Sequence, residues 1–153
     1  MYASEARNNV KEREYRALGG IEESVMKRVF KTLRSCPRHL LYLEAGVVPA
    51  RYQVHRQVLN FLQYIVQQPS DSLLYRMLMT MINSPTRGDW ASSANKLLEK
   101  YEIELSFEDI KTMKNSKFKS LVKKQIHKVA FRDLINKKNA GDKGGTSNMN
   151  VFK

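Results

Sequence analysis

Four prolines divide this chain into segments whose hydrophobic residues recur three and four positions apart. They are Pro37, Pro49, Pro69 and Pro85, and each lies between two apolar runs. Spacings of three and four bring side chains to one face of an α-helix, and proline does not continue a helix. Alternation at period two is scarce, and neither Asn-Gly nor Asp-Gly occurs to mark a hairpin. The pattern predicts an all-α fold, a compact bundle of about six to eight short helices.

Glycines and capping residues predict where these helices begin and end. Gly19 and Gly20 are expected to end a first helix, and Gly46 to end a short helix that Pro37 opens. Ser70 or Asp71 is expected to cap the helix after Pro69, Asp89 the next one, and Ser106 a short one. The helices are predicted at about residues 4–18, 22–34, 37–46, 50–68, 71–82, 89–101, after 106, and 116–137.

The C-terminal end differs from the rest in composition. Residues 138–153 hold three of the seven glycines among Lys, Ser, Thr and Asn. Such a segment has too little apolar surface to fold by burial, so it is predicted to be a disordered basic tail. The chain is then one helical domain, residues 1–137, followed by the tail, residues 138–153.

Apolar stripes on these helices predict the core. The clearest stripe follows Pro49 and contains Val54, Val58, Phe61, Leu62 and Ile65. A second stripe precedes Pro37 and contains Val25, Val29, Phe30 and Leu33. The Leu and Met residues at 73–82 cover two of three helix faces, which favours a central helix over a protein-binding groove. Trp90 is expected to close the core over its loop, and four tyrosines are expected at the boundary rather than as base-stacking platforms: Tyr42, Tyr52, Tyr64 and Tyr75.

The net charge of +12 is concentrated in the last third of the chain. Residues 1–110 carry 15 basic and 13 acidic side chains, whereas residues 111–153 carry 12 and 2. A strongly cationic segment attracts polyanions, so nucleic acid is the first partner to consider.

One predicted helix carries most of this charge. At about 100° per residue, Phe118, Leu121, Val122, Ile126 and Val129 share one side of it. Lysines dominate the other side, and a lysine face can follow a phosphate backbone by point-charge contact. The alternative is an ordinary solvated helix face; a membrane-surface helix is less favoured, because the apolar side is needed for the core and lacks Trp. The candidate nucleic-acid-binding residues are Lys117, Lys119, Lys123, Lys124, Lys128 and Arg132, with Arg51 and Arg56 as second choices.

Motifs for other chemistries are missing. The sequence has no glycine-rich phosphate loop, no Gly-x-Ser-x-Gly elbow and no His-Glu-x-x-His pair. Cys36 and His39 have Cys-x-x-His spacing, but zinc needs four ligands, so a loop cysteine and a polar histidine are the favoured interpretation. We expect no enzyme activity, cofactor, metal, small-molecule substrate or membrane partner. The lone cysteine and the charged first 20 residues predict an intracellular location, nuclear or cytoplasmic, without secretion.

Several segments in order resemble one protein family. Residues 37–46 (PRHLLYLEAG), 48–52 (VPARY) and 85–90 (PTRGDW) resemble motifs of the reverse-transcriptase-bearing polyproteins of non-LTR retrotransposons. Residues 116–123 (SKFKSLVK) and Ala130-Phe131 are similar to a later helix of the family, and residues 2–6 (YASEA) to the stretch that ends its polymerase core. The similarity spans about residues 2–135 in register.

The resemblance implies a position rather than a reaction. It places the chain in the helical thumb and connector region downstream of the polymerase palm. The family's Tyr-x-Asp-Asp turn, nuclease motifs and Cys/His knuckle are absent from this sequence. The resemblance therefore implies a non-catalytic fragment or remnant that holds nucleic acid and contacts other reverse transcriptase domains. A helical protein–protein interaction module, docking on the rest of a polymerase or on a host partner, stays the alternative.

Overall fold

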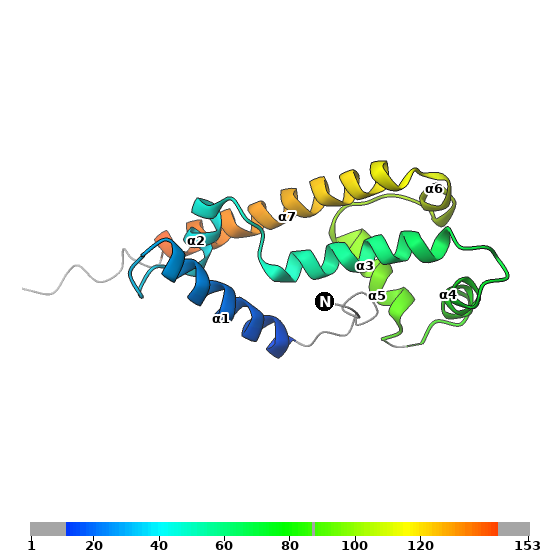
Figure 1. Cartoon of the computed structure of the whole chain (residues 1–153), viewed down its shortest axis with the longest axis horizontal. Coiled ribbons are helices and arrows are strands. Elements are labelled where there is room, and N and C mark those ends of the chain that lie inside the picture. Colours follow the sequence, from blue (N-terminus) through cyan, green and yellow to red (C-terminus); the bar gives the residue numbers. More distant parts are fainter. Residues whose placement is uncertain (1–11, 87, 144–153) are drawn as a thin grey trace, which may run out of the picture.

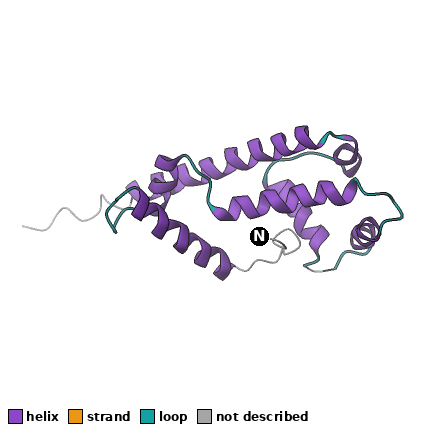
Figure 2. Ribbon diagram, viewed as in Figure 1, coloured by secondary structure: helices purple, strands orange, loops and turns teal. Residues whose placement is uncertain are grey.

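The structure, a computed structural model, describes residues 12–86 and 88–143. Within these ranges it contains seven α-helices and no strand, which confirms the predicted all-α fold (Figures 1 and 2). The helices are α1 (Glu12–Val29), α2 (Arg38–Ala45), α3 (Ala50–Val66), α4 (Leu73–Asn83), α5 (Trp90–Lys100), α6 (Phe107–Thr112) and α7 (Asn115–Lys143). None of them is long and apolar enough to cross a membrane.

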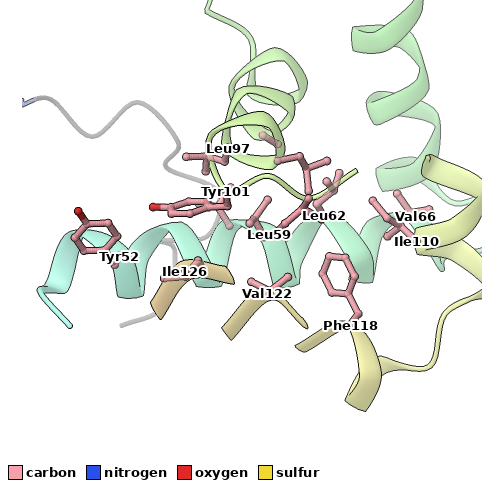
Figure 3. Close-up of a cluster of buried hydrophobic side chains, with 14 of the residues drawn as sticks. Tyr52, Leu59, Leu62, Val66, Leu97, Tyr101, Ile110, Phe118, Val122 and Ile126 are labelled. Carbon is pink, nitrogen blue, oxygen red and sulfur yellow. The ribbon is translucent and has the colours of Figure 1, made fainter. Parts of the chain in front are cut away.

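Helices α3 and α7 lie side by side along the long axis of the molecule and form its centre (Figure 1). They run antiparallel: the Tyr52 hydroxyl donates to Asp133 at 2.7 Å, and at the other end Gln67 Nε2 donates to the Met113 carbonyl at 3.0 Å. Helices α1, α4, α5 and α6 pack on α3, while α2 packs on α7. The buried side chains between them include Leu59, Leu62, Tyr101, Phe118, Val122 and Ile126 (Figure 3).

Local sequence accounts for most helix ends. Gly46 ends α2 with a φ of 63°, in the left-handed region that glycine adopts without strain. The Asp89 side chain accepts a hydrogen bond from the Ser92 amide and caps α5. Ser106 and Asp109 form a reciprocal capping box at α6. The predicted cap of α4 was wrong by one or two positions, since Ser72 caps the helix after a turn in which its amide donates to the Pro69 carbonyl.

The predicted break at Gly19-Gly20 was also wrong, because α1 is continuous from Glu12 to Val29. Gly19 instead allows a close approach: a Cβ atom there would lie 2.7 Å from Nη1 of Arg38 on α2. The same guanidinium donates to Glu23 on α1 at 2.7 Å. Gly19 therefore leaves room for the Arg38 side chain of α2 beside α1 and does not end a helix.

Two predicted core stripes lie largely at the surface. Val25, Val29 and Leu33 are 55%, 68% and 78% exposed, and Phe30 is 44% exposed. In α4 only Leu78 is buried, while Leu73 and Met77 are 72% and 47% exposed. The prediction of a central α4 was wrong, because the helix crosses one end of the molecule and contacts α3 and α5 on one side (Figure 1).

The C-terminal helix is longer than predicted. Helix α7 continues to Lys143, so residues 138–143 belong to the helix and not to the predicted tail. The predicted tail residues 144–153, and residues 4–11 of the predicted first helix, lie outside the described residues. Tyr42 and Tyr52 are buried, with hydroxyls that donate to Glu22 and Asp133, while Tyr64 remains exposed.

Candidate nucleic-acid interface

The lysine and arginine side chains of α7 that the structure describes are all exposed to solvent. Phe118, Val122, Ile126 and Val129 are at most 2% exposed, which fixes the face of α7 that packs on the core. The predicted division of the helix into an apolar and a cationic side is therefore confirmed. The six predicted cations of α7 are all exposed: Lys117, Lys119, Lys123, Lys124, Lys128 and Arg132.

Two of these cations are already paired. Lys128 Nζ and Arg132 Nη1 donate to the Glu102 carboxylate at 2.8 Å and 2.9 Å. The bonds from Lys128 and then Arg132 lower the pKa of Glu102. Glu102 follows α5 with a φ of 56°, at the left-handed position of a helix C-terminus where the Ile103 amide donates to the Leu98 carbonyl. Glu102 therefore offsets one of the two positive charges of Lys128 and Arg132 on this edge of α7.

The edge of α7 that faces α3 carries a row without carboxylates. Lys119 and Lys123 are one helical turn apart, roughly 6 Å along the axis, and His127 continues the row. Arg56 of α3 joins them, since burial, Lys123 and then Arg56 all lower the pKa of His127. Among the described residues, no carboxylate pairs with Lys119, Lys123 or Arg56. We call these three residues the open cation row.

Lys117 and Lys124 lie on the outer surface of α7. They are seven residues apart, and both are exposed. Seven residues are close to two helical turns, so the two side chains share a face. No described carboxylate pairs with either lysine, and at 100° per residue both lie on the side of α7 that carries Lys128, away from Lys119 and Lys123.

Arg51 is not part of this surface. Its guanidinium binds the Glu12 carboxylate at 2.5 Å and lies over the Tyr15 ring, 4.7 Å from the centroid. The same bond is the main cause that lowers the pKa of Glu12. The structure therefore separates the two second-choice residues: Arg56 joins the lysines of α7, while Arg51 holds α1 against α3.

A groove lies between α3 and the first turns of α7, beside the open cation row. Its volume is about 470 Å³, and amide side chains form much of its wall. Lys119 lines it, and so do Phe61 and Tyr64, whose rings stack with centroids 6.0 Å apart and planes 13° apart. The sequence motifs did not predict this groove, although Gln57, Asn60, Tyr64 and Gln67 recur at helical spacing opposite the apolar stripe. That spacing was the available signal.

The other predicted alternatives find no assembled site. The described part of the chain brings no three His, Cys, Asp or Glu residues together as metal ligands. The Cys36 thiol contacts the Pro37 carbonyl at 4.0 Å. An apolar hollow of about 250 Å³ lies between α3, α4 and α5, lined by Leu74, Met77, Met81 and Trp90 among others.

Comparisons with known proteins add no further information. No family model, no curated protein and no solved structure matches the chain. The resemblance to retrotransposon reverse transcriptases therefore stays a prediction from the sequence motifs.

Proposed function

We propose that this chain binds nucleic acid without sequence preference, by holding the phosphate backbone against the open cation row, with Lys117 and Lys124 on the outer surface of the same helix. The observation that carries the proposal is a set of cations on two adjacent helices, exposed lysines on α7 and the partly exposed Arg56 on α3, with which no described carboxylate pairs. Each lysine that contacts a phosphate releases condensed counterions, which favours binding at low salt. Lysine contacts phosphate as a point charge, so little base discrimination is expected.

The sequence resemblance supplies the biological setting of the proposal. In a non-LTR reverse transcriptase, the thumb and connector region follows the catalytic palm and holds the template–primer duplex by its backbone. We propose the same non-catalytic role for this chain, with the other reverse transcriptase domains as its protein partners. The length of the cationic surface along α7 supports a ligand that is itself an extended polyanion.

The test measures binding to a labelled RNA–DNA hybrid at about 50 and 200 mM salt. We expect the affinity to fall by one or more orders of magnitude over this range, because the release of counterions from several phosphates is less favourable at higher salt. The variant Lys119→Gln/Lys123→Gln removes two cations from the open row and is expected to reduce the slope of log affinity against log salt by about 2.

The matched control is Lys128→Gln/Arg132→Gln. It removes the same number of cations from the same helix, but from the edge that Glu102 occupies. We expect its salt slope to stay close to that of the unmodified chain. No binding of the unmodified chain at low salt would overturn the proposed function. Equal losses in both variants would overturn the assignment to the open cation row.

A second candidate function is docking on another protein. It is favoured by the stripe on α1, where Ile21, Val25 and Val29 are between 55% and 68% exposed. Exposed apolar patches of this kind often mark protein contacts. This function predicts self-association or binding to a neighbouring polymerase domain that Val25→Ser/Val29→Ser removes, as measured by sedimentation. Binding of nucleic acid would be unaffected by that variant.

A further inference from the structure

The groove between α3 and α7 has the size of a site for a small organic group. Its volume of about 470 Å³ lies within the ordinary range for ligand pockets. Its polar lining includes Gln57, Asn60 and Tyr64 from α3, Gln67 at the C-terminal end of that helix, and Asn115 and Lys119 from α7. One wall is thus rich in hydrogen-bonding amides, and a cation lies on the other.

A row of three aromatic rings leads to the surface at this groove. Trp90 meets the Phe61 ring edge to face, with centroids 5.7 Å apart and planes 86° apart. Phe61 stacks in turn on Tyr64, and the planes of these two rings are 13° apart. Phe61 is partly buried against the core, whereas Tyr64 is 53% exposed. The row therefore presents an exposed flat ring whose orientation is fixed from beneath.

The amides of the groove are held in place and keep acceptors for a ligand. Gln63 and Gln67 both donate through Nε2 to the Met113 carbonyl, at 3.2 Å and 3.0 Å. These bonds fix the two side chains by their donor atoms. Gln67 is partly exposed and keeps its amide oxygen as an acceptor, whereas Gln63 is only 1% exposed. Asn60 also lines the groove, and its Oδ1 atom is buried without a hydrogen-bond partner among the described residues. This atom is closed to solvent, so a ligand N–H group would reach it only after the Asn60 side chain turned towards the groove.

Positively charged side chains lie in the groove and beside it. Lys119 lies in its wall, and Lys123 and Arg56 continue beyond it towards His127. A ligand that stacks a flat ring in the groove would thus find cations along the path that leads out of it. Flat rings with N–H donors, joined by a chain of phosphates, are the chemistry of a nucleic-acid strand with unpaired bases.

We propose that the groove binds single-stranded nucleic acid, with an unpaired base stacked on Tyr64 and the flanking phosphates on Lys119, Lys123 and Arg56. This inference rests on the proposed function and adds the form of the ligand. Duplex nucleic acid buries its base faces within its own stack, so it contacts the cations alone. Stacking on an aromatic side chain tolerates any base, which agrees with binding that lacks sequence preference.

The test compares two ligands that share one backbone. The first is a short single-stranded DNA with bases, and the second is an abasic oligomer of the same length, which has the same phosphates. The unmodified chain is expected to bind the first more tightly by about 5- to 150-fold, the ratio that one stacked base provides. Tyr64→Ala is expected to remove this preference and to leave binding of the abasic oligomer unchanged.

Two control variants separate stacking from other effects. Tyr64→Phe keeps the flat ring and is expected to keep the preference for bases. Tyr75→Ala removes an aromatic ring on α4, outside the groove, and is expected to change nothing. Circular dichroism and a thermal melt of each variant establish that it is folded, which is expected for Tyr64→Ala because the side chain is largely exposed.

The outcomes distinguish the two proposals. Equal binding of both ligands by the unmodified chain, or a preference for bases that survives Tyr64→Ala, overturns the stacking inference. In either case salt-sensitive binding that depends on Lys119 and Lys123 would still support the proposed function. Absence of binding to both ligands and to the RNA–DNA hybrid at low salt overturns both proposals. Tighter binding of a polyglutamate peptide than of either oligomer would also overturn the inference, since that ligand offers charge without rings.

Discussion

His55 is buried at the centre of the contact between α3, α1 and α5, and it predicts a loss of stability in mild acid. The side chain is 8% exposed, and its Nδ1 atom lies 2.5 Å from the Tyr101 hydroxyl. The rings of Tyr15 and Tyr52 meet it edge to face. Burial, and to a smaller extent the nearby charges of Lys100 and Arg51, lower the pKa of His55 from 6.5 to about 3.

The size of the effect follows from the two pKa values. Below its ordinary pKa of 6.5, the imidazole takes up a proton in the unfolded chain but stays neutral in the folded one. The unfolded state then binds more protons, so the free energy of unfolding falls as the pH falls. At pH 5, about 1.5 units below 6.5, the loss is about 2 kcal/mol, and it continues to grow until the pH reaches the folded pKa.

Other groups add little to this window. Hydrogen bonds from their partners lower the pKa values of carboxylates such as Glu12, Glu23 and Asp89 below the ordinary values of 4.5 for Glu and 3.8 for Asp. Their contribution to stability is present above those values and is lost at lower pH. His127 has a lowered pKa and acts in the same direction as His55, so a direct comparison of variants is needed.

The assay is urea unfolding of the unmodified chain and of His55→Gln at pH 7 and pH 5. His55→Gln is expected to be less stable at pH 7, because the ring contacts are lost, but to lose about 2 kcal/mol less than the unmodified chain between the two pH values. His39→Gln, at a partly exposed position, is the matched control and is expected to keep the full pH dependence. An identical pH dependence in His55→Gln and in the unmodified chain would refute the reasoning.

Three further predictions concern α1, α7 and the Glu102 pair. Gly20→Ala is expected to stabilise the chain by about 0.5–1 kcal/mol in thermal melts, because nothing lies within 4 Å of the added Cβ. Gly19→Ala is expected to stabilise the chain less, because its added Cβ meets the Arg38 side chain of α2. Equal stabilisation by the two variants would contradict this close approach. The pKa of His127, measured by NMR titration, is expected to rise in Lys123→Gln, because this variant removes one of the positive charges near the imidazole. It is also expected to rise in the unmodified chain when nucleic acid binds, so binding should strengthen as the pH falls through that pKa. A pKa of His127 that does not change on addition of nucleic acid would show that the ligand binds elsewhere. Glu102→Gly is expected to leave Lys128 and Arg132 without their carboxylate and so to increase the affinity for nucleic acid at low salt. The fold should stay stable, because glycine adopts the left-handed backbone of this position without strain. A decrease in affinity would contradict this prediction.

Local signals predicted the fold well wherever they act over a few residues. The prolines before α2 and α3, the left-handed Gly46 and the cap Asp89 each determine the backbone of their neighbours. The failure at Gly19-Gly20 has a different origin, since the role of Gly19 depends on Arg38, which is distant in sequence. The apolar stripes of α1 and α4 likewise have helical spacing, but spacing alone does not specify whether another element covers the stripe.

For the candidate nucleic-acid interface, as for the fold, the sequence predicted local features but not contacts between distant residues. The apolar positions of α7 fixed which face is buried, and so they fixed the exposure of the lysines. The pairs that divide these lysines were not predictable, because Glu102 lies 26 residues from Lys128 and 30 from Arg132. The pairing of Arg51 with Glu12 spans 39 residues in the same way. Only the packing of α1, α5 and α7 on α3 determines which cations meet a carboxylate.

The two edges of α7 therefore differ in whether their cations pair with a carboxylate. Spacings of four place Lys119, Lys123 and His127 on the edge beside α3, and Lys124, Lys128 and Arg132 on the other edge. Glu102 neutralises part of the second row, and Asp133, the one acidic side chain of α7 that the structure describes, is occupied by the Tyr52 hydroxyl. The row with which no described carboxylate pairs is therefore the one next to the groove and its exposed Tyr64, so under the proposed function a strand held on these cations would lie where an unpaired base can reach the ring.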